Sequence, residues 1–172
     1  NEWGGGSSMP ELLAAFVQPN DRGTERLVKA AAEALRRAVA GEALNGYQSG
    51  SREAVWRMVN AAWVAVSGAG LDYALPPASF EREGQKIRSP GDVLESGLAT
   101  CLDSSVLFAA ILEQMGLHPI VVLVRDHAFA GAWLVPQKFG TLLVDNVVEV
   151  HITCGLHTAC HSLHSDAAER RL

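Results

Sequence analysis

Cysteines, basic clusters and long apolar runs are all scarce in this chain of 172 residues. The three cysteines, Cys101, Cys154 and Cys160, are unevenly spaced and do not make the framework of a disulfide-stapled domain. No stretch of about 18 apolar residues occurs, which excludes a membrane-spanning helix. We therefore expect a protein of the reducing cytoplasm that makes no contact with a membrane.

The charge balance is acidic. The chain has 14 Lys and Arg residues against 19 Asp and Glu residues, which gives a formal net charge of -5. Nucleic acids attract positively charged surfaces, so an acidic chain without a Lys/Arg cluster is a poor partner for DNA or RNA. We expect no direct nucleic-acid binding by this segment.

The chain begins with NEWGGGSSMPELL, which lacks an initiator methionine and the basic and apolar regions of a signal peptide. We expect a segment cut from a longer protein. Residues 1–8 would be a linker from a preceding segment, residues 9–150 one domain, and residues 151–172 an atypical tail that is disordered or truncated. A hydrophobic content of 48% is enough for the core of such a domain.

The first half of the chain has the periodicity of helices. Residues 9–17 predict a short helix with Pro10 near its first turn. Ser51 is a candidate N-cap, and Gly41 a candidate stop. Two segments, 24–40 and 52–70, repeat apolar residues at the spacing of one buried helical face. These residues are Leu27, Ala31, Leu35 and Val39 in the first segment, and Val55, Met58, Ala62 and Val66 in the second.

The second half alternates turn signals with short elements. Residues 71–90 form an irregular connection, which in a compact domain is often functional. Ser89, Pro90 and Gly97 predict the cap, first position and end of a short helix. A longer helix from Cys101 ends at Gly116, and strands are indicated at 119–124, 127–135 and 141–145. The order predicts an α+β fold with a small antiparallel sheet packed on the Cys101 helix.

Cys101 and His127 form a candidate catalytic pair. Thr100 is a good cap, so Cys101 falls in the first turn, where unpaired N–H groups and partial positive charge stabilise a thiolate. A helix of about 16 residues and a returning strand of seven or eight have similar lengths, about 24 Å, which brings His127 back to the level of Cys101. The alternatives are a small buried cysteine and a histidine that is only a satisfied polar group.

Two stretches, GLATCLDSSVLFAAILEQMGLHPIVVLV and DHAFAGAWL, resemble the core of the transglutaminase-like superfamily, whose fold is the papain-like cysteine-protease core. The matching residues are Gly97, Cys101, Asp103, Ala109, Gly116, His127, Ala128 and Phe129. Further blocks, such as GYQSG and YALPPASFEREGQKIRSP, are similar to transglutaminase-like domains of very large bacterial proteins that also carry superfamily 1 helicase modules. The resemblance covers residues 3–150 and implies a transglutaminase-like domain over 9–150.

The resemblance implies a catalytic triad, in which Cys101 attacks a carbonyl, His127 is the general base and an acid orients the histidine. The superfamily places the acid at the start of the next strand, where Asp145 is the candidate. Asp145 could instead cap a helix at 146–150. The last residues, EVHITCGLHTACHSLHSDAAERRL, depart from the pattern of the narrower relatives, so the true acid could also be missing from this chain.

Two further residues are candidates for supporting roles. The Gln85 side-chain amide could donate to a developing oxyanion beside the Cys101 backbone N–H, or it could only tie down the irregular loop. Asp103 could orient a neighbour, but its place in the first helical turn favours a structural capping role.

The tail is rich in possible metal ligands, namely His151, Cys154, His157, Cys160, His161 and His164. Their spacing does not give two matched pairs, and no glycine knuckles frame them. We therefore expect no metal site, and the chemistry proposed above requires no cofactor.

We consider three functions. The first is a cysteine hydrolase or acyltransferase acting on a peptide or isopeptide carbonyl of a protein or peptide substrate. The second is a catalytically silent interaction module of the same fold, whose partners are the helicase or ATPase domains of a larger chain. The third is a structural spacer. Fold alone does not distinguish them.

Overall fold

The computed structural model describes residues 2–3, 10–75, 85–124, 127–137 and 140. These residues form a mixed helix and strand structure, which agrees with the predicted α+β class. None of the helices in these ranges combines the length and the apolar content needed to cross a membrane. The predicted strand at 141–145, with Asp145, and the tail at 151–172 lie outside the described residues.

Helix α1 (Arg22–Ala38) begins at Asp21, whose side chain accepts a hydrogen bond from the Gly23 N–H. Its predicted apolar face is confirmed at Leu27, Ala31 and Leu35, which are buried. The prediction for Val39 is wrong. Val39 is the C-cap with an extended backbone, at φ -138° and ψ 111°, so its side chain leaves the helical face and is exposed.

Helix α2 (Arg52–Ser67) begins at the predicted cap, because the Ser51 side chain accepts from the Ala54 N–H. Three of the four residues of its predicted stripe are buried, and Val66 packs partly buried against them. Residues Ala31 and Ala62 are fully buried in the same cluster as side chains of α1, α2 and α4. This cluster is the larger of two cores and holds the helices together.

The two helices around the candidate cysteine also begin as the sequence predicts. Helix α3 (Pro90–Ser96) is capped by Ser89 and ends at Gly97, which adopts the left-handed conformation at φ 67°. This conformation favours glycine because it carries no Cβ. Helix α4 (Cys101–Gln114) follows after four residues, with Thr100 as its N-cap.

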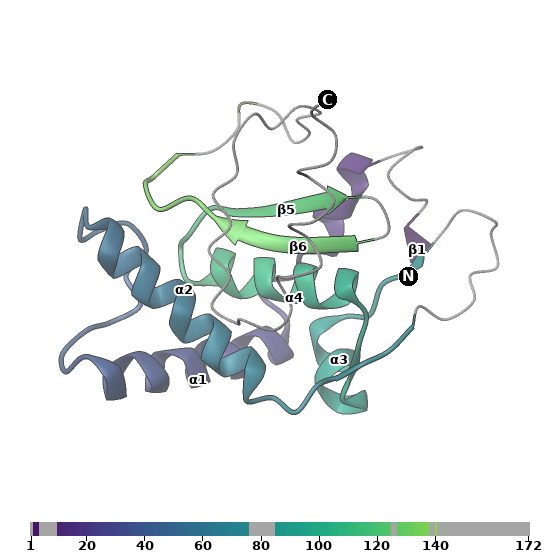
Figure 1. Cartoon of the computed structure of the whole chain (residues 1–172), viewed down its shortest axis with the longest axis horizontal. Coiled ribbons are helices and arrows are strands. Elements are labelled where there is room, and N and C mark those ends of the chain that lie inside the picture. Colours follow the sequence, from purple (N-terminus) through teal and green to yellow (C-terminus); the bar gives the residue numbers. More distant parts are fainter. Residues whose placement is uncertain (1, 4–9, 76–84, 125–126, 138–139, 141–172) are drawn as a thin grey trace, which may run out of the picture.

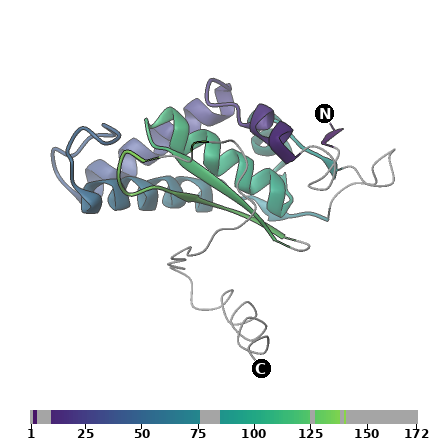
Figure 2. The same cartoon turned by 90° about the horizontal axis from the view of Figure 1, so that it is seen from above.

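A β-hairpin covers α4. Strands β5 (Pro119–Val124) and β6 (His127–Ala132) pair antiparallel, with Val124 opposite His127 and Pro119 opposite Ala132. Figures 1 and 2 place this hairpin along α4, with α1 and α2 on another side of that helix. The predicted packing of an antiparallel sheet on the Cys101 helix is therefore confirmed for these two strands.

Two short strand pairs and one 3₁₀ helix complete the described fold. Strand β1 (Glu2–Trp3) pairs antiparallel with β3 (Gln85–Lys86), and β2 (Asp72–Tyr73) pairs parallel with β4 (Leu98–Ala99). The parallel pair is a separate two-stranded sheet that the sequence did not predict. The predicted N-terminal helix is a 3₁₀ helix, η1 (Pro10–Phe16), whose Leu13 is buried.

Candidate functional site

Cys101 is the first residue of α4 and is half-buried. Its side chain packs against the smaller of the two cores, which joins η1, the segment after β3, the first turns of α4 and the start of β6. The buried members of this core are Leu13, Ile87, Leu102, Val106 and Ala128. The thiol therefore lies at a junction of four elements and is partly open to solvent.

Thr100 and Asp103 fix the start of α4 by capping each other. The Thr100 Oγ1 accepts from the Asp103 N–H at 3.1 Å, and the Asp103 Oδ2 accepts from the Thr100 N–H at 3.0 Å. Both side chains are buried. Within the described part of the chain, no group accepts a hydrogen bond from the N–H of Cys101 or Leu102. We call these two donors open because no group of the described residues accepts from them, although Leu102 itself is buried.

Asp103 also forms an ion pair with Arg88. The Arg88 Nη1 donates to Asp103 Oδ2 at 2.7 Å, and the Arg88 backbone N–H donates to Oδ1 at 2.8 Å. The carboxylate is 1% exposed, so its charge is taken out of water and balanced by the guanidinium. Asp103 therefore has the structural capping role, and it ties the segment before α3 to α4.

Gln85 reaches the same place from β3. Its Nε2 donates to Thr100 Oγ1 at 3.1 Å. The amide thus lies beside the residue that precedes Cys101, and only one of its two N–H groups is used in this bond. Both predicted roles remain compatible with this contact, since it ties the loop down and leaves a second donor near the start of α4.

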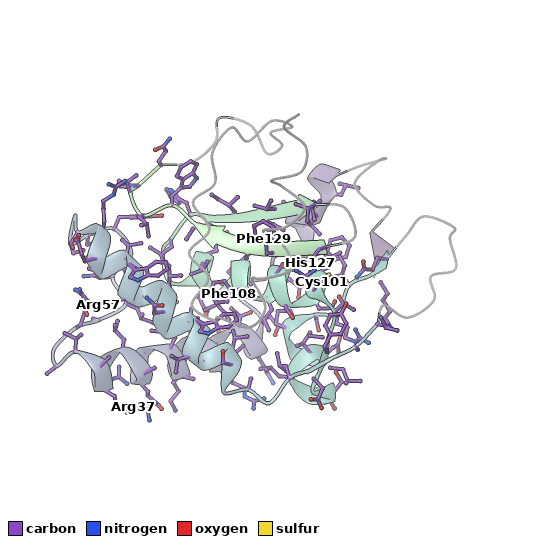
Figure 3. All side chains as sticks on the ribbon, in the orientation of Figure 1. Arg37, Arg57, Cys101, Phe108, His127 and Phe129 are labelled. Carbon is purple, nitrogen blue, oxygen red and sulfur yellow. The ribbon has the colours of Figure 1, made fainter. Side chains whose placement is uncertain are left out.

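His127 is the first residue of β6, at the end of the hairpin that lies beside the start of α4 (Figure 3). Its neighbour Ala128 is buried in the small core against which Cys101 packs. Ala128 is buried and His127 is exposed, and Figure 3 labels His127 next to Cys101, between the start of β6 and the start of α4. No hydrogen bond joins the Cys101 sulfur to the His127 ring in the described chain.

The third member of the predicted triad lies outside the described residues, as Asp145 follows residue 140. The histidines and cysteines of the tail lie outside them as well. Within the ranges that the structure describes, no group of three or more His, Cys, Asp or Glu side chains could hold a metal ion.

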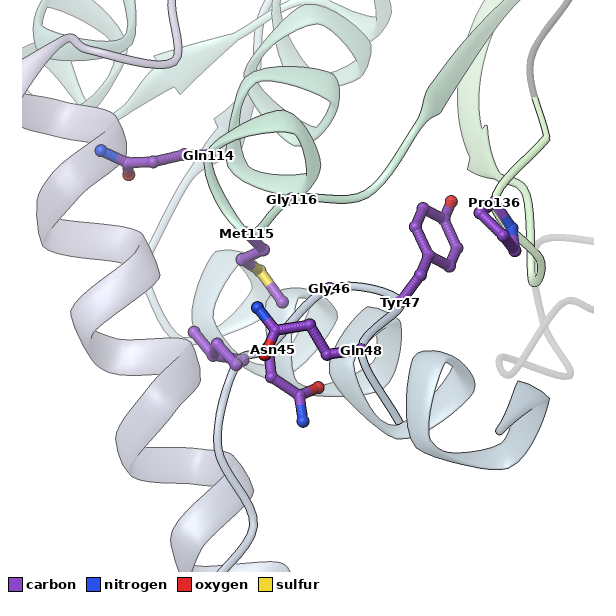
Figure 4. A pocket seen from close by; sticks show the side chains of 9 residues that line it. Asn45, Gly46, Tyr47, Gln48, Gln114, Met115, Gly116 and Pro136 are labelled. Atoms are coloured by element: carbon purple, nitrogen blue, oxygen red, sulfur yellow. The ribbon is translucent and has the colours of Figure 1, made fainter. Parts of the chain in front are cut away.

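Two open hollows lie away from the thiol. A hollow of about 540 Å³ is found at the opposite end of α4, where Tyr47, Met115 and Gly116 are among its lining residues (Figure 4). A second, of about 310 Å³, is lined by Lys86, Arg88, Asp92, Glu95 and Ser96. Neither includes Cys101 or His127 in its lining, so we base the site on the contacts at the start of α4.

Arg88 is the residue of this site that sequence reasoning missed. A single arginine in the irregular connection carries no local signal, because its role depends on a carboxylate 15 residues later in the chain. The arrangement as a whole offers a half-buried thiol, two open backbone donors, a side-chain amide and a histidine at one end of α4. No protein-family model matches this chain, and no curated protein or solved structure matches it.

Proposed function

We propose that the chain is a cysteine-dependent hydrolase or acyltransferase domain of the transglutaminase-like kind, acting on a peptide or isopeptide carbonyl. The observation that carries this proposal is the environment of Cys101. Its thiol sits on the first residue of a 14-residue helix, and the Cys101 and Leu102 N–H groups in that turn have no hydrogen-bond partner among the described residues. A helix N-terminus of this kind stabilises a thiolate and can also donate to an oxyanion.

The reaction begins when the His127 imidazole accepts the proton of the Cys101 thiol. The thiolate attacks the carbonyl carbon, and the tetrahedral oxyanion accepts hydrogen bonds from the open backbone N–H groups and from Gln85. The C–N bond then breaks, the leaving amine takes the proton from His127, and a thioester remains on Cys101. Water or a second amine attacks the thioester, which releases the acyl group and restores the thiol.

A silent interaction module of the same fold is the second candidate. It is favoured by one observation, that His127 is exposed and forms no hydrogen bond with Cys101 among the described residues. In that case the small apolar residues of the hairpin serve packing alone, and the partners are other domains of a larger chain. For the enzyme, the imidazole and the thiol come within hydrogen-bond reach when substrate binds, since catalytic hydrogen bonds often tighten only in the substrate complex.

Acylation of Cys101 separates the two candidates. The experiment uses a chain with Cys154→Ser and Cys160→Ser, so that Cys101 is the one thiol, and follows its reaction with a p-nitrophenyl acyl ester by intact mass. We expect a thioester adduct on Cys101, formed about 100-fold more slowly in His127→Gln because general-base catalysis contributes roughly that factor or more.

The matched control is His118→Gln, which removes the histidine next to the other end of the hairpin. His118 bonds to the Gln137 carbonyl and stacks at a tilt on Tyr47, away from Cys101. If His127→Gln and His118→Gln acylate at the same rate, the imidazole of His127 plays no part, and the interaction module becomes the better account.

A further inference from the structure

The start of α4 holds an electrostatic conflict. A thiolate at Cys101 is stabilised by the partial positive charge of the helix N-terminus. Asp103 places a full negative charge in the same turn, with its Oδ2 at 3.0 Å from the N–H of Thr100, the residue before Cys101. The carboxylate that caps the helix therefore works against a negative charge on the neighbouring thiol.

Arg88 removes this conflict. Its guanidinium lies 2.7 Å from Asp103 Oδ2, and the pair has little contact with solvent, with side-chain exposures of 18% for Arg88 and 0% for Asp103. Screening by water is weak for such a pair, so the guanidinium cancels most of the field of the carboxylate. Two acids of α3, Asp92 and Glu95, line a hollow together with Arg88. Neither of them forms an ion pair with Arg88.

The packing around Arg88 holds the guanidinium in this position. Ile87 is 2% exposed and belongs to the small core against which Cys101 packs. On the other side, Ser89 caps α3, and the Arg88 backbone N–H itself donates to Asp103. The arginine is thus anchored from both neighbours and through its own backbone, which is more than an exposed surface pair has.

We propose that Arg88 is a positioning residue for Cys101: by neutralising Asp103, it lets one carboxylate cap α4 without suppressing the thiolate. A role of Arg88 in catalysis rests on the proposed function. Its test does not, because the reactivity of the thiol can be measured without any substrate. Among the described residues, the other ionisable groups at this end of the fold include His127 on β6, Lys86 on β3, and Asp92 and Glu95 on α3, and all of them stay constant across the variants below.

A series of charge variants tests the proposal. In the chain with Cys101 as its one thiol, alkylation by iodoacetamide is measured from pH 5 to pH 9 for wild type, Arg88→Gln, Asp103→Asn and the double variant. We expect Arg88→Gln to react about tenfold more slowly at pH 6 and Asp103→Asn about tenfold faster, since one unpaired charge in the same turn changes the ionisation equilibrium by that order. The double variant should return close to wild type.

The order of the rates distinguishes charge from simple damage. If Arg88 only held the loop in place, both single variants would loosen the start of α4 and shift the profile in the same direction, which would overturn the proposal. Arg57→Gln is the control, because it breaks a more exposed ion pair, with Glu42 at 2.6 Å, on a distant part of the fold (Figure 3). If circular dichroism shows that Arg88→Gln does not fold, the test uses Asp103→Asn with Arg88 intact. An alkylation rate of Cys101 that is unchanged or slower in this variant contradicts the proposal.

Discussion

Thr100 joins two parts of the chain through one oxygen atom. Its Oγ1 accepts from the Asp103 N–H and from the Gln85 Nε2, each at 3.1 Å, and the residue is 0% exposed. Without this oxygen the buried Asp103 N–H and the half-buried Gln85 amide would both lose this acceptor. The residue that sets the first turn of α4, and with it the position of Cys101, is therefore also the one that fastens β3 to the helix.

We predict that Thr100→Ala lowers the free energy of unfolding by about 2 kcal/mol, the upper end of the range for an N-cap, because the oxygen is buried and accepts twice. The measurement is urea denaturation, with Thr100→Ser as the variant that keeps the oxygen. Ser51→Ala is the matched control at an open cap, where a single N–H, from Ala54, donates at 3.3 Å and a loss of about 0.5 kcal/mol is expected. Equal losses at the two caps would contradict the role given to Thr100.

At the scale of elements, Tyr47 connects the loop between α1 and α2 to the hairpin. Its hydroxyl donates to the Trp133 carbonyl at 2.8 Å and accepts from the His118 N–H at 3.0 Å. Beside it, Gly46 packs so closely on Gly116 that a Cβ would come within 2.8 Å of the Gly116 carbonyl oxygen. The end of α4 farthest from Cys101 is thus held by one tyrosine and a glycine–glycine contact.

Tyr47 gives a prediction about alkaline pH. Burial raises the pKa of Tyr47 above its ordinary value of 10.0, although the hydrogen bond from the His118 backbone opposes this. A raised pKa means that the neutral phenol stabilises the fold, fully below pH 10 and less as the pH rises through the folded pKa. At pH 7, Tyr47→Phe should lower the free energy of unfolding by about 1 kcal/mol, because the substitution removes both hydrogen bonds of the hydroxyl.

The check is urea denaturation of wild type and Tyr47→Phe at several pH values from 7 to 11. The difference in free energy of unfolding between them should shrink above pH 10, because wild type then loses the contribution that the variant never had. Other groups that titrate in this range act on both chains equally. A difference that stays constant to pH 11 would mean that the Tyr47 hydroxyl does not stabilise the fold as described.

Caps and strands were predictable because their signals are local. The side chains of Ser51, Ser89 and Thr100 bond to backbone atoms within three residues, so the sequence alone places them. Pairings such as Arg88 with Asp103, or Tyr47 with Trp133, join residues 15 and 86 positions apart. Tertiary packing decides those partners, and no short pattern encodes them. The two-residue strands β2 and β4 were missed for the same reason.

Helix α1 shows where apolar periodicity stops predicting which residues are buried. Leu27, Ala31 and Leu35 are buried as their spacing predicts, and the pattern continues to Val39 although the helix has ended. Apolar spacing predicts which residues would share a face, but the chain leaves the helical path where the backbone turns extended. In the site, Cys101 was placed at the start of its helix and His127 at the start of its strand correctly, while the approach of the two side chains depends on how the hairpin packs on α4.

At the scale of the whole molecule, α4 lies at the centre. It contacts the hairpin as well as α1, α2 and α3, and both ends are fixed, one by the Thr100 capping box and the other by the contacts of Tyr47 and Gly46 (Figure 1). A helix held at both ends keeps its first turn in a constant position. We propose that this position makes Cys101 a reactive nucleophile rather than an inert core residue.

The most direct test compares the same thiol in the folded and unfolded chain. With Cys154→Ser and Cys160→Ser, the rate of iodoacetamide alkylation at pH 6 is measured in buffer and in concentrated urea. If the start of α4 stabilises the thiolate, the folded chain should react about tenfold faster than the unfolded one, despite the half-burial of Cys101. A folded chain that reacts more slowly than the unfolded one would identify Cys101 as a buried structural residue and contradict the account.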